Sequence, residues 1–302
     1  MRNIPHNRTM QNIFTPQWSE YELIDSGNGR KLERFGSVIV DRVETQAIWR
    51  PSQTPAVWQK ADAVFHKTGD KHGEWQVRIS LPTPWKVTWN GVQLVLRLTP
   101  FGHVGIFPEQ AVQWEWMTKK IRDAARPVKV LSLFSYTGAA TLAAAAAGAE
   151  VVHVDASKPA ITWARENQNV SGLADKKIRW IPDDAAKFVQ REIRRGNRYD
   201  AIVMDPPKYG RGTSGEVWQF ETAIAQLLAD CQKLLAEDAI FLLVNAYAVP
   251  ISPITLQNLV SDVMPKTRGT IAAGELGLQE TRSQRVLPTA IFARWESGKA
   301  IA

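Results

Sequence analysis

Cysteine is nearly missing from this sequence, because Cys231 is the only one among 302 residues. A single thiol excludes an internal disulfide framework and suits a reducing compartment, so we expect a cytoplasmic location. The five histidines are scattered and offer no zinc-type spacing, so we expect no metal. No apolar run reaches the roughly 18 residues that a membrane-spanning helix needs, and the polar first eight residues lack the apolar stretch of a secretion signal. We therefore expect no membrane partner.

Acidic residues are outnumbered, with 30 Asp and Glu against 37 Lys and Arg and a formal charge of +7. Most of the excess lies in residues 1–126, which carry 17 basic and 12 acidic side chains. A positive excess favours phosphate-rich partners through counterion release. Nucleic acid is therefore a candidate partner, and a merely basic enzyme is the plainer alternative.

The first part of the chain is rich in tryptophan and in short alternating segments, which turn signals such as Asn90-Gly91 separate. Short strands at such spacing indicate a β-rich module. The segments are Val38–Val40, Glu74–Ile79, Val87–Trp89 and Leu94–Leu98. We expect a tail over residues 1–18 and a β-rich N-terminal domain over residues 19–112.

From Pro127 onward, apolar strand-like runs alternate with helix-like stretches, which predicts a mostly parallel sheet covered on both faces. The strand–helix pairs are Val128–Phe134 and Ala139–Ala147, Val151–Val154 and Pro159–Val170, Ile178–Ile181 and Ala185–Arg195, Ala201–Met204 and Glu216–Leu235, and Ile240–Val244 and Ile254–Val263. Thr270–Ala272 and Thr289–Arg294 follow without a helix between them, so the last strand should pair antiparallel. We expect a Rossmann-like, seven-stranded α/β domain over residues 113–302.

The first of these strands runs into a helix through Phe134-Ser135-Tyr136-Thr137-Gly138. In open parallel sheets, ligands bind at the carboxyl ends of strands where the strand order reverses. A dinucleotide would need Gly-x-Gly-x-x-Gly here to cradle its pyrophosphate, but this loop has one glycine. A cofactor without phosphates needs no such cradle, and one glycine with small polar residues suits the methionine part of S-adenosylmethionine.

Acidic residues end the next two strands. Asp155, followed by Ala156, can accept hydrogen bonds from both ribose hydroxyls, as in dinucleotide sites. Asp184, or its neighbour Asp183, can reach the exocyclic amine of adenine. A single acid at such a position is more often a helix N-cap. Suitable groups at three successive strand ends favour a cofactor site.

The fourth strand is followed by Asp205-Pro206-Pro207-Lys208-Tyr209. Two prolines stiffen the turn, which would hold the Asp205 carboxylate and the Pro206 carbonyl as acceptors beside the methyl group. Tyr209 could stack on a flat substrate ring or be a core aromatic residue. Lys208 and Arg211 could contact phosphate or simply be solvated surface.

Methyl transfer is an in-line displacement, so positioning can supply most of the rate enhancement. Asp205 and the Pro206 carbonyl could aim an amine lone pair at the methyl group. Methylation of a pyrimidine carbon would also require a thiolate nucleophile. Cys231 lies within an expected helix and away from every strand end, so we interpret it as structural.

With these motifs the chain resembles the bacterial large-subunit ribosomal RNA methyltransferases, especially the cytosine-C5 branch, over roughly residues 90–295. The resemblance includes Gly105-Ile106-Phe107-Pro108-Glu109-Gln110, which in that family lies near the cofactor pocket and implies a supporting role for Gln110. Where the cytosine-C5 enzymes carry Ser-Cys-Ser, this chain has Asn245-Ala246-Tyr247, so it lacks the catalytic cysteine of that branch. Residues 1–126 resemble instead the tryptophan-rich part of a less characterised subgroup of class I methyltransferases.

Three functions follow from these observations. The first is methylation of RNA, with ribosomal RNA favoured, at a nitrogen or oxygen, because unpaired bases are held by aromatic stacking and phosphate contacts. The second keeps the chemistry but has a protein or a small molecule as substrate, since the fold cannot name a substrate. The third is a non-catalytic module that binds S-adenosylmethionine.

Overall fold

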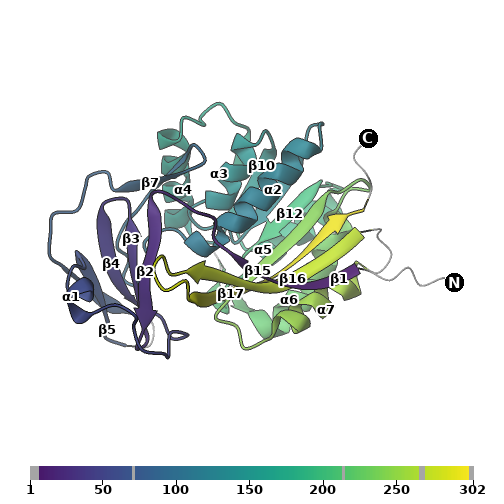
Figure 1. The fold of residues 1–302 in the computed structure, drawn as a ribbon. Helices are drawn as coiled ribbons and strands as arrows, with labels where there is room; N and C mark the ends of the chain where they lie inside the picture. Colours follow the sequence, from purple (N-terminus) through teal and green to yellow (C-terminus); the bar gives the residue numbers. More distant parts are fainter. Residues whose placement is uncertain (1–6, 70–71, 213–214, 265–268, 299–302) are drawn as a thin grey trace. The chain divides into compact units, whose positions relative to one another are not determined.

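The computed structural model describes residues 7–69, 72–212, 215–264 and 269–298 (Figure 1). Contacts within the chain define two compact units. Unit 1 comprises residues 1–13, 113–276 and 290–302, and unit 2 comprises residues 14–112 and 277–289. None of the described helices is long and apolar enough to span a membrane.

Unit 1 is built on an eight-stranded sheet with the order β1-β16-β17-β15-β12-β9-β10-β11. The strands are β1 (Asn7–Phe14), β9 (Lys129–Leu133), β10 (Glu150–Asp155), β11 (Ile178–Pro182), β12 (Ala201–Met204), β15 (Phe241–Tyr247), β16 (Gly269–Gln279) and β17 (Val286–Ser297). β11, β10, β9, β12 and β15 run parallel, and β17 is antiparallel to β15. The mostly parallel sheet and its antiparallel last strand are therefore confirmed.

Helices cover both faces of this sheet. Neighbouring residues of a strand point to opposite faces, so the contacts of two neighbours show what covers each face. The helices are α2 (Ala111–Asp123), α3 (Ala139–Ala146), α4 (Lys158–Val170), α5 (Ala185–Arg194), α6 (Phe220–Leu234) and α7 (Pro253–Val263). Val152 joins the apolar cluster that contains the buried side chains of α5, α6 and α7. Its neighbour His153 instead meets Thr141 of α3 at 2.9 Å. The Phe241 ring lies on the α2 side, 5.1 Å from the ring of Trp116.

The two ends of unit 1 differ from the expected domain plan. Asn7–Phe14 is the edge strand β1 and makes the sheet eight-stranded, although residues 1–18 were expected to be a tail. A Cβ at Gly274 of β16 would lie 1.4 Å from the Gln11 carbonyl oxygen, so glycine permits this close approach. Residues 277–289, which the sequence places in the second domain, make their contacts within unit 2.

The segment after the fourth parallel strand also differs from the expected pattern. The sequence predicts one helix over Glu216–Leu235, but Val217–Gln219 forms β14, which pairs with β13 (Tyr209–Arg211). Helix α6 begins only at Phe220. The strand forms because Trp218 is tied back to the preceding loop by a 2.6 Å hydrogen bond from its indole to the Pro207 carbonyl.

Unit 2 is β-rich, as the sequence predicts. It contains a five-stranded sheet with the order β2-β3-β4-β5-β6 and the hairpin β7–β8. Its elements are β2 (Tyr21–Gly27), β3 (Arg30–Phe35), β4 (Val38–Val43), the short helix α1 (Pro55–Trp58), β5 (Ala63–Lys67), β6 (Gly73–Val77), β7 (Lys86–Trp89), β8 (Val92–Val95) and the 3₁₀ turn η1 (Pro108–Gln110). The two central residues of the β7–β8 turn, Asn90 and Gly91, both have positive φ, at 44° and 85°. This conformation matches the twist of a tight hairpin.

Strands β3 and β4, together with the residue that follows β4, bury charged side chains. Lys31, Glu33, Arg42 and Glu44 are between 0% and 6% exposed. Arg42 Nη2 lies 2.7 Å from Glu33 Oε2, and Lys31 Nζ lies 3.2 Å from Glu44 Oε2. Burial opposes ionisation, but the opposite charges outweigh it, lowering the pKa of Glu33 and raising those of Lys31 and Arg42. Lys31, Glu33 and Arg42 are therefore held ionised inside unit 2.

Glu109, on η1, is a further buried carboxyl group beside this cluster. Burial raises its pKa to about 7, although the nearby Lys31 and Arg42 act to lower it. The same charges, together with burial, lower the pKa of His103 to about 4. Unit 2 thus contains both a compensated set of charges and a carboxyl group that is only partly compensated.

Candidate active site at the strand ends

The strand order of unit 1 reverses at β9, which has β10 on one side and β12 on the other. The edge beyond the carboxyl ends of strands at such a point is where open α/β sheets bind ligands. The predicted site segments all leave strands at this edge: Phe134–Gly138 follows β9, Asp155–Ala156 ends β10, Asp183–Asp184 follows β11 and Asp205–Tyr209 follows β12. The structure therefore brings together every predicted site residue of unit 1.

The loop after β9 has an unusual backbone. Phe134, Tyr136 and Gly138 have φ values of 54°, 47° and 84°. Residues other than glycine rarely adopt this region, and such strain is concentrated at ligand sites. At Gly138 the space for a side chain is also tight, since a Cβ there would lie 3.0 Å from the Cβ of Ala164 on α4.

Neighbouring elements hold the loop in this shape. The Ser135 amide donates a hydrogen bond to the Val154 carbonyl at 3.2 Å. The buried Asn167 side chain of α4 donates to the Thr137 carbonyl at 2.9 Å. Asn167 lies 30 residues from Thr137 in the sequence, so no local pattern could have identified it.

Asp155 is the central carboxylate of the site. Its Oδ2 accepts the Tyr136 amide at 2.7 Å and its Oδ1 accepts the Ser157 amide at 2.8 Å. Burial raises its pKa, and these two amide hydrogen bonds act in the opposite direction. Each carboxylate oxygen can accept more than one hydrogen bond, so both can still receive hydroxyl groups. The backbone of two loops thus orients a bidentate acceptor.

The two acids after β11 have different surroundings. Asp183 is engaged at both oxygens, since Oδ1 accepts the Asp184 amide at 2.8 Å and Oδ2 pairs with Arg191. Asp184 is the N-cap of α5 and accepts the Lys187 amide at Oδ1, 2.9 Å away. Within the described part of the chain, Asp184 Oδ2 accepts no hydrogen bond. Capping and ligand binding are therefore compatible at Asp184.

The Asp205-Pro206-Pro207 turn is fixed against β9 and the β13–β14 hairpin. The Asp205 amide donates to the Leu133 carbonyl at 3.3 Å, which places this carboxylate beside the start of the Phe134–Gly138 loop. The Pro207 carbonyl accepts the Trp218 indole. The buried Pro206 has a carbonyl that accepts no hydrogen bond from the residues that the structure describes. It therefore remains an acceptor beside Asp205.

The hairpin that follows carries the remaining predicted residues. Lys208, Tyr209 and Arg211 are exposed, and Tyr209 retains 47% of its surface. Tyr209 is thus not a core aromatic residue. Trp218 was not predicted from the sequence as a site residue; its ring packs 4.9 Å from that of Phe134 and so couples the hairpin to the loop after β9.

Comparison with known proteins identifies this arrangement. A family model described as S-adenosylmethionine-dependent methyltransferase matches residues 25–250. The chain belongs to this family. A crystal structure of a methyltransferase of this kind from Agrobacterium tumefaciens is 45% identical, covers 98% of this chain and 97% of its own, and has a TM-score of 0.92. The cofactor predicted from the sequence, S-adenosylmethionine, is therefore confirmed at the level of the family.

Curated relatives of this methyltransferase match only in part. Ribosomal RNA large subunit methyltransferase K of Neisseria meningitidis is 29% identical over 53% of this chain and 44% of its own length. Ribosomal RNA large subunit methyltransferase I of Aeromonas salmonicida is 31% identical over 58% of this chain and 39% of its own. The chain thus spans less than half the length of these relatives. A Streptococcus mutans protein described as an S-adenosylmethionine-dependent methyltransferase is 17% identical with a TM-score of 0.69, which shows the fold alone.

The donor set of the methyltransferase site fits S-adenosylmethionine. The Asp155 carboxylate suits a pair of ribose hydroxyls, Asp184 Oδ2 suits an amine, and the single-glycine loop offers no phosphate cradle. The described residues contain no group of three or more His, Cys, Asp or Glu that could hold a metal ion.

Two further residues of the methyltransferase were singled out from the sequence. Cys231 is fully buried on α6, where burial raises the pKa of its thiol, and its structural role stays a prediction that this burial supports. Gln110 lies on η1 in unit 2, where its backbone amide donates to the Phe107 carbonyl at 3.0 Å. Its supporting role at the cofactor stays a prediction.

Proposed function

We propose that this chain transfers a methyl group from S-adenosylmethionine to a nitrogen or oxygen of RNA, with ribosomal RNA the favoured substrate. The observation that carries the proposal is the convergence of Asp155, Asp184 and Asp205 at one edge of the sheet, around its switch point. Such an edge is the ligand site of open parallel sheets.

In this proposal each of the cofactor-binding residues contacts a different part of S-adenosylmethionine. Asp155 accepts the two ribose hydroxyls, with Ala156 lining the same strand end. Asp184, with Asp183 behind it, receives the adenine amine. The Phe134–Gly138 loop contacts the methionine part, and Gln110 supports the site. When bound, S-adenosylmethionine supplies an electrophilic methyl group.

The Asp205–Tyr209 segment would then position the methyl acceptor. Asp205 and the Pro206 carbonyl accept hydrogen bonds from an amine or hydroxyl group, which aims its lone pair at the methyl group. Pro207 and the Trp218 indole keep this turn rigid. Positioning of this kind can supply a large part of a rate enhancement. No thiolate is required, in keeping with the burial of Cys231.

RNA is proposed as the substrate on three grounds. The curated relatives are named as ribosomal RNA methyltransferases. The exposed Tyr209 ring lies next to the reactive turn, where it could stack on an unpaired base. Lys208 and Arg211, exposed on either side of it, could contact phosphates. A location in the cytoplasm, where ribosomal RNA is made in bacteria, belongs to the same proposal.

The test is to incubate the protein with methyl-labelled S-adenosylmethionine and extract from cells that lack its gene, and then to digest separately with nuclease and protease. The proposal expects label that nuclease releases, after which mass analysis of the nucleosides names the atom. Label that protease alone releases would replace RNA with a protein substrate. Label in neither fraction would leave a small molecule or a non-catalytic module. The Asp205→Ala variant serves as the matched control for background.

A further inference from the structure

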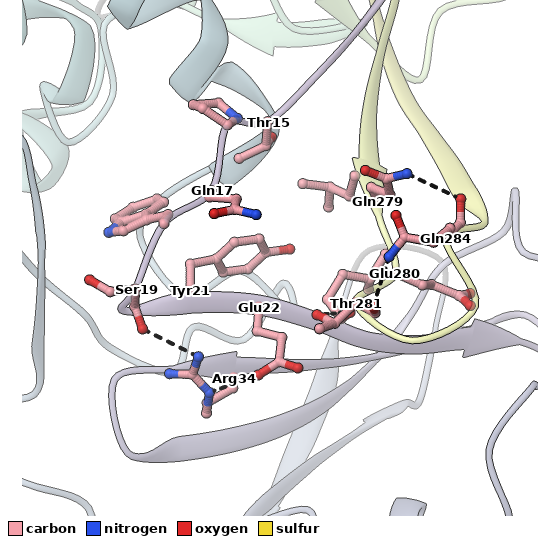
Figure 2. Close-up of a pocket in the computed structure, with 14 residues that line it drawn as sticks. Thr15, Gln17, Ser19, Tyr21, Glu22, Arg34, Gln279, Glu280, Thr281 and Gln284 are labelled. Atoms are coloured by element: carbon pink, nitrogen blue, oxygen red, sulfur yellow. Dashed lines mark hydrogen bonds and ion pairs between the residues drawn. The ribbon is translucent and has the colours of Figure 1, made fainter.

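Unit 2 contains a cavity that no step of the proposed reaction uses. Its volume is about 660 Å³, within the range of small-molecule sites. One wall is formed by the segment before β2, including Gln17, and by Tyr21 of β2. The other is formed by the end of β16 and the turn after it, including Gln279, Thr281 and Gln284 (Figure 2).

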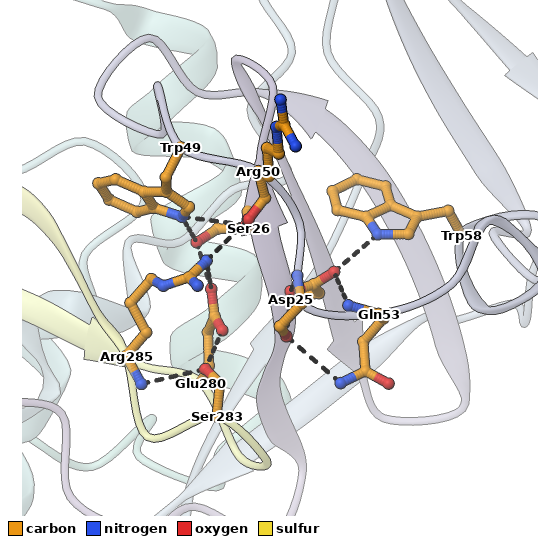
Figure 3. Close-up of polar contacts among 10 residues, drawn as sticks. Asp25, Ser26, Trp49, Arg50, Gln53, Trp58, Glu280, Ser283 and Arg285 are labelled. Atoms are coloured by element: carbon orange, nitrogen blue, oxygen red, sulfur yellow. Dashed lines mark hydrogen bonds and ion pairs between the residues drawn. The ribbon is translucent and has the colours of Figure 1, made fainter.

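The charged groups around the cavity are compensated. The Glu22 carboxylate lies 3.1 Å from Arg34 Nε, and the same guanidinium donates to the Gly36 and Ser19 carbonyls. The fully buried Glu280 accepts the Ser26 hydroxyl at 2.5 Å and the Ser283 hydroxyl (Figure 3). The cavity therefore offers no unpaired cation, and a free phosphate or another small anion is a poor ligand for it.

The wall formed by the β16–β17 turn is held in place before any ligand binds. The Glu280 contacts with Ser26 join the turn to β2, and the Thr281 amide donates to the Leu23 carbonyl at 3.1 Å. The Arg285 guanidinium also donates to the Arg50 carbonyl at 3.1 Å. A preformed wall lowers the entropy cost of binding.

Neutral side-chain amides supply the polar surface of the cavity. The exposed Gln17 amide makes no hydrogen bond with the residues that the structure describes. Gln279 uses its Nε2 for the Gln284 carbonyl at 3.3 Å, which leaves its Oε1 as an acceptor. Tyr21, which is 7% exposed and packs against Trp18 and Phe35, adds a small aromatic surface to the lining. Amides that both donate and accept, beside an aromatic ring, match the edge and face of a nucleobase.

We propose that this cavity binds one unpaired base of the RNA, an inference that rests on the proposed function. Gln17 and Gln279 hydrogen-bond the edge of the base, and Tyr21 contacts its ring. Arg282, exposed on the same turn, can meet the adjoining phosphate. Unit 2 would in this way recognise a nucleotide separate from the one that unit 1 methylates.

The test measures binding of a fluorescently labelled single-stranded RNA 12-mer to the full chain by anisotropy at several salt concentrations. The variants are Gln17→Leu, Gln279→Leu and the double variant, and Gln46→Leu is the control, because Gln46 is exposed on unit 2 and does not line the cavity. We expect the double variant to weaken binding by about tenfold, since each lost hydrogen bond costs roughly three- to fivefold. The slope of log Kd against log salt should not change, because no charge is removed. Arg282→Gln should instead reduce that slope.

A second measurement tests whether the base itself is recognised. A 12-mer of abasic ribose phosphates should bind the wild-type chain more weakly than the RNA does. The loss of affinity caused by removing the bases should be smaller in the double variant. The two substitutions and the removal of the bases eliminate the same contacts.

Two results would overturn the inference. One is a double variant that binds RNA as tightly as Gln46→Leu does, and the other is an equal loss from abasic RNA in the double variant and in the wild type. If label still enters RNA in either case, the proposed function stands without this cavity. If label enters protein instead, the proposed function and this inference both fail.

Discussion

The carboxylates of unit 1 that concern the reaction lie where strands end, whereas Glu33, an ionised carboxylate of unit 2, lies within strand β3. Asp155 and Asp205 are only partly buried, and the Asp155 carboxylate accepts hydrogen bonds from two backbone amides. Glu33, by contrast, is fully buried between Arg42 and Lys31. A strand end leaves acceptor capacity for a ligand, while a position inside a sheet requires that every charge be met by the protein itself.

This contrast predicts that the largest effect on stability comes from unit 2. Glu33→Ala should lower the free energy of unfolding by about 3–5 kcal/mol, because it leaves Arg42 and Lys31 buried without their shared partner. Denaturant unfolding measures the change. The control is Glu150→Ala in unit 1, which breaks an exposed pair with Lys177 and should have little effect. A Glu33→Ala protein as stable as the control would show that the buried cluster is not an energetic unit.

The corresponding change in unit 1 should affect the rate of methyl transfer and not the free energy of unfolding. Asp205→Ala should lower turnover on the order of 10²-fold, because the methyl acceptor loses its orientation. The dissociation constant for S-adenosylmethionine should change little. Turnover and calorimetric binding, measured on one preparation, separate the two quantities. Equal losses in both would contradict the positioning role and make Asp205 a cofactor ligand.

The effect of Glu109 on the free energy of unfolding should have the opposite sign from that of Glu33, because the charge of Glu109 is not fully compensated. Its pKa of about 7 exceeds the ordinary value of 4.5. Between these two pH values the unfolded chain releases a proton that the folded chain retains, so the free energy of unfolding falls as pH rises through this window. Glu109→Gln removes this loss and should be more stable than the wild type at pH 8 by about 2 kcal/mol.

Urea unfolding of Glu109→Gln and wild type at pH 5 and pH 8 checks this prediction. His103, whose pKa is lowered to about 4, contributes an opposite pH dependence, but it is present in both proteins and cancels in the difference. The control is Glu115→Gln on the exposed side of α2. A stability difference that does not grow from pH 5 to pH 8 would mean that Glu109 is compensated after all.

The smallest of the expected effects concerns binding alone. Asp155→Ala should weaken binding of S-adenosylmethionine by about 1–3 kcal/mol, the usual cost of leaving buried hydrogen-bonding partners unpaired. The variant also removes the acceptor of the Tyr136 and Ser157 amides. Asp155→Asn keeps an oxygen acceptor and should lose less. Calorimetry decides the matter, and an unchanged dissociation constant for Asp155→Ala would show that the ribose lies elsewhere.

The same contrast explains what the sequence could predict. In unit 1 the apolar runs are continuous, so Ala201–Met204 and its companions could be predicted, and the acids after them define the site. In unit 2 the segment Arg30–Phe35 appears polar in sequence, yet it is an interior strand whose charges are paired by residues of β2, of β4 and of the segment just after β4. Local patterns contain no information about such partners, nor about Trp218 and Asn167, which reach the site from distant segments.

The cavity of unit 2 could not be predicted from the sequence, for a related reason. Its two walls come from Gln17 and Gln279, which lie far apart in the chain, and the turn after Gln279 was assigned from the sequence to the other domain. Contacts between residues far apart in the sequence, such as those of Glu280 with Ser26 and of Thr281 with Leu23, bring these segments together.

The central claim is that the strand ends around Asp155 hold S-adenosylmethionine with its methyl group beside Asp205. A crystal structure of this chain with S-adenosylhomocysteine tests it most directly. We expect both ribose hydroxyls within hydrogen-bonding distance of Asp155 and the sulfur facing the Asp205-Pro206 turn. A ligand bound away from these two residues would show that the site lies elsewhere.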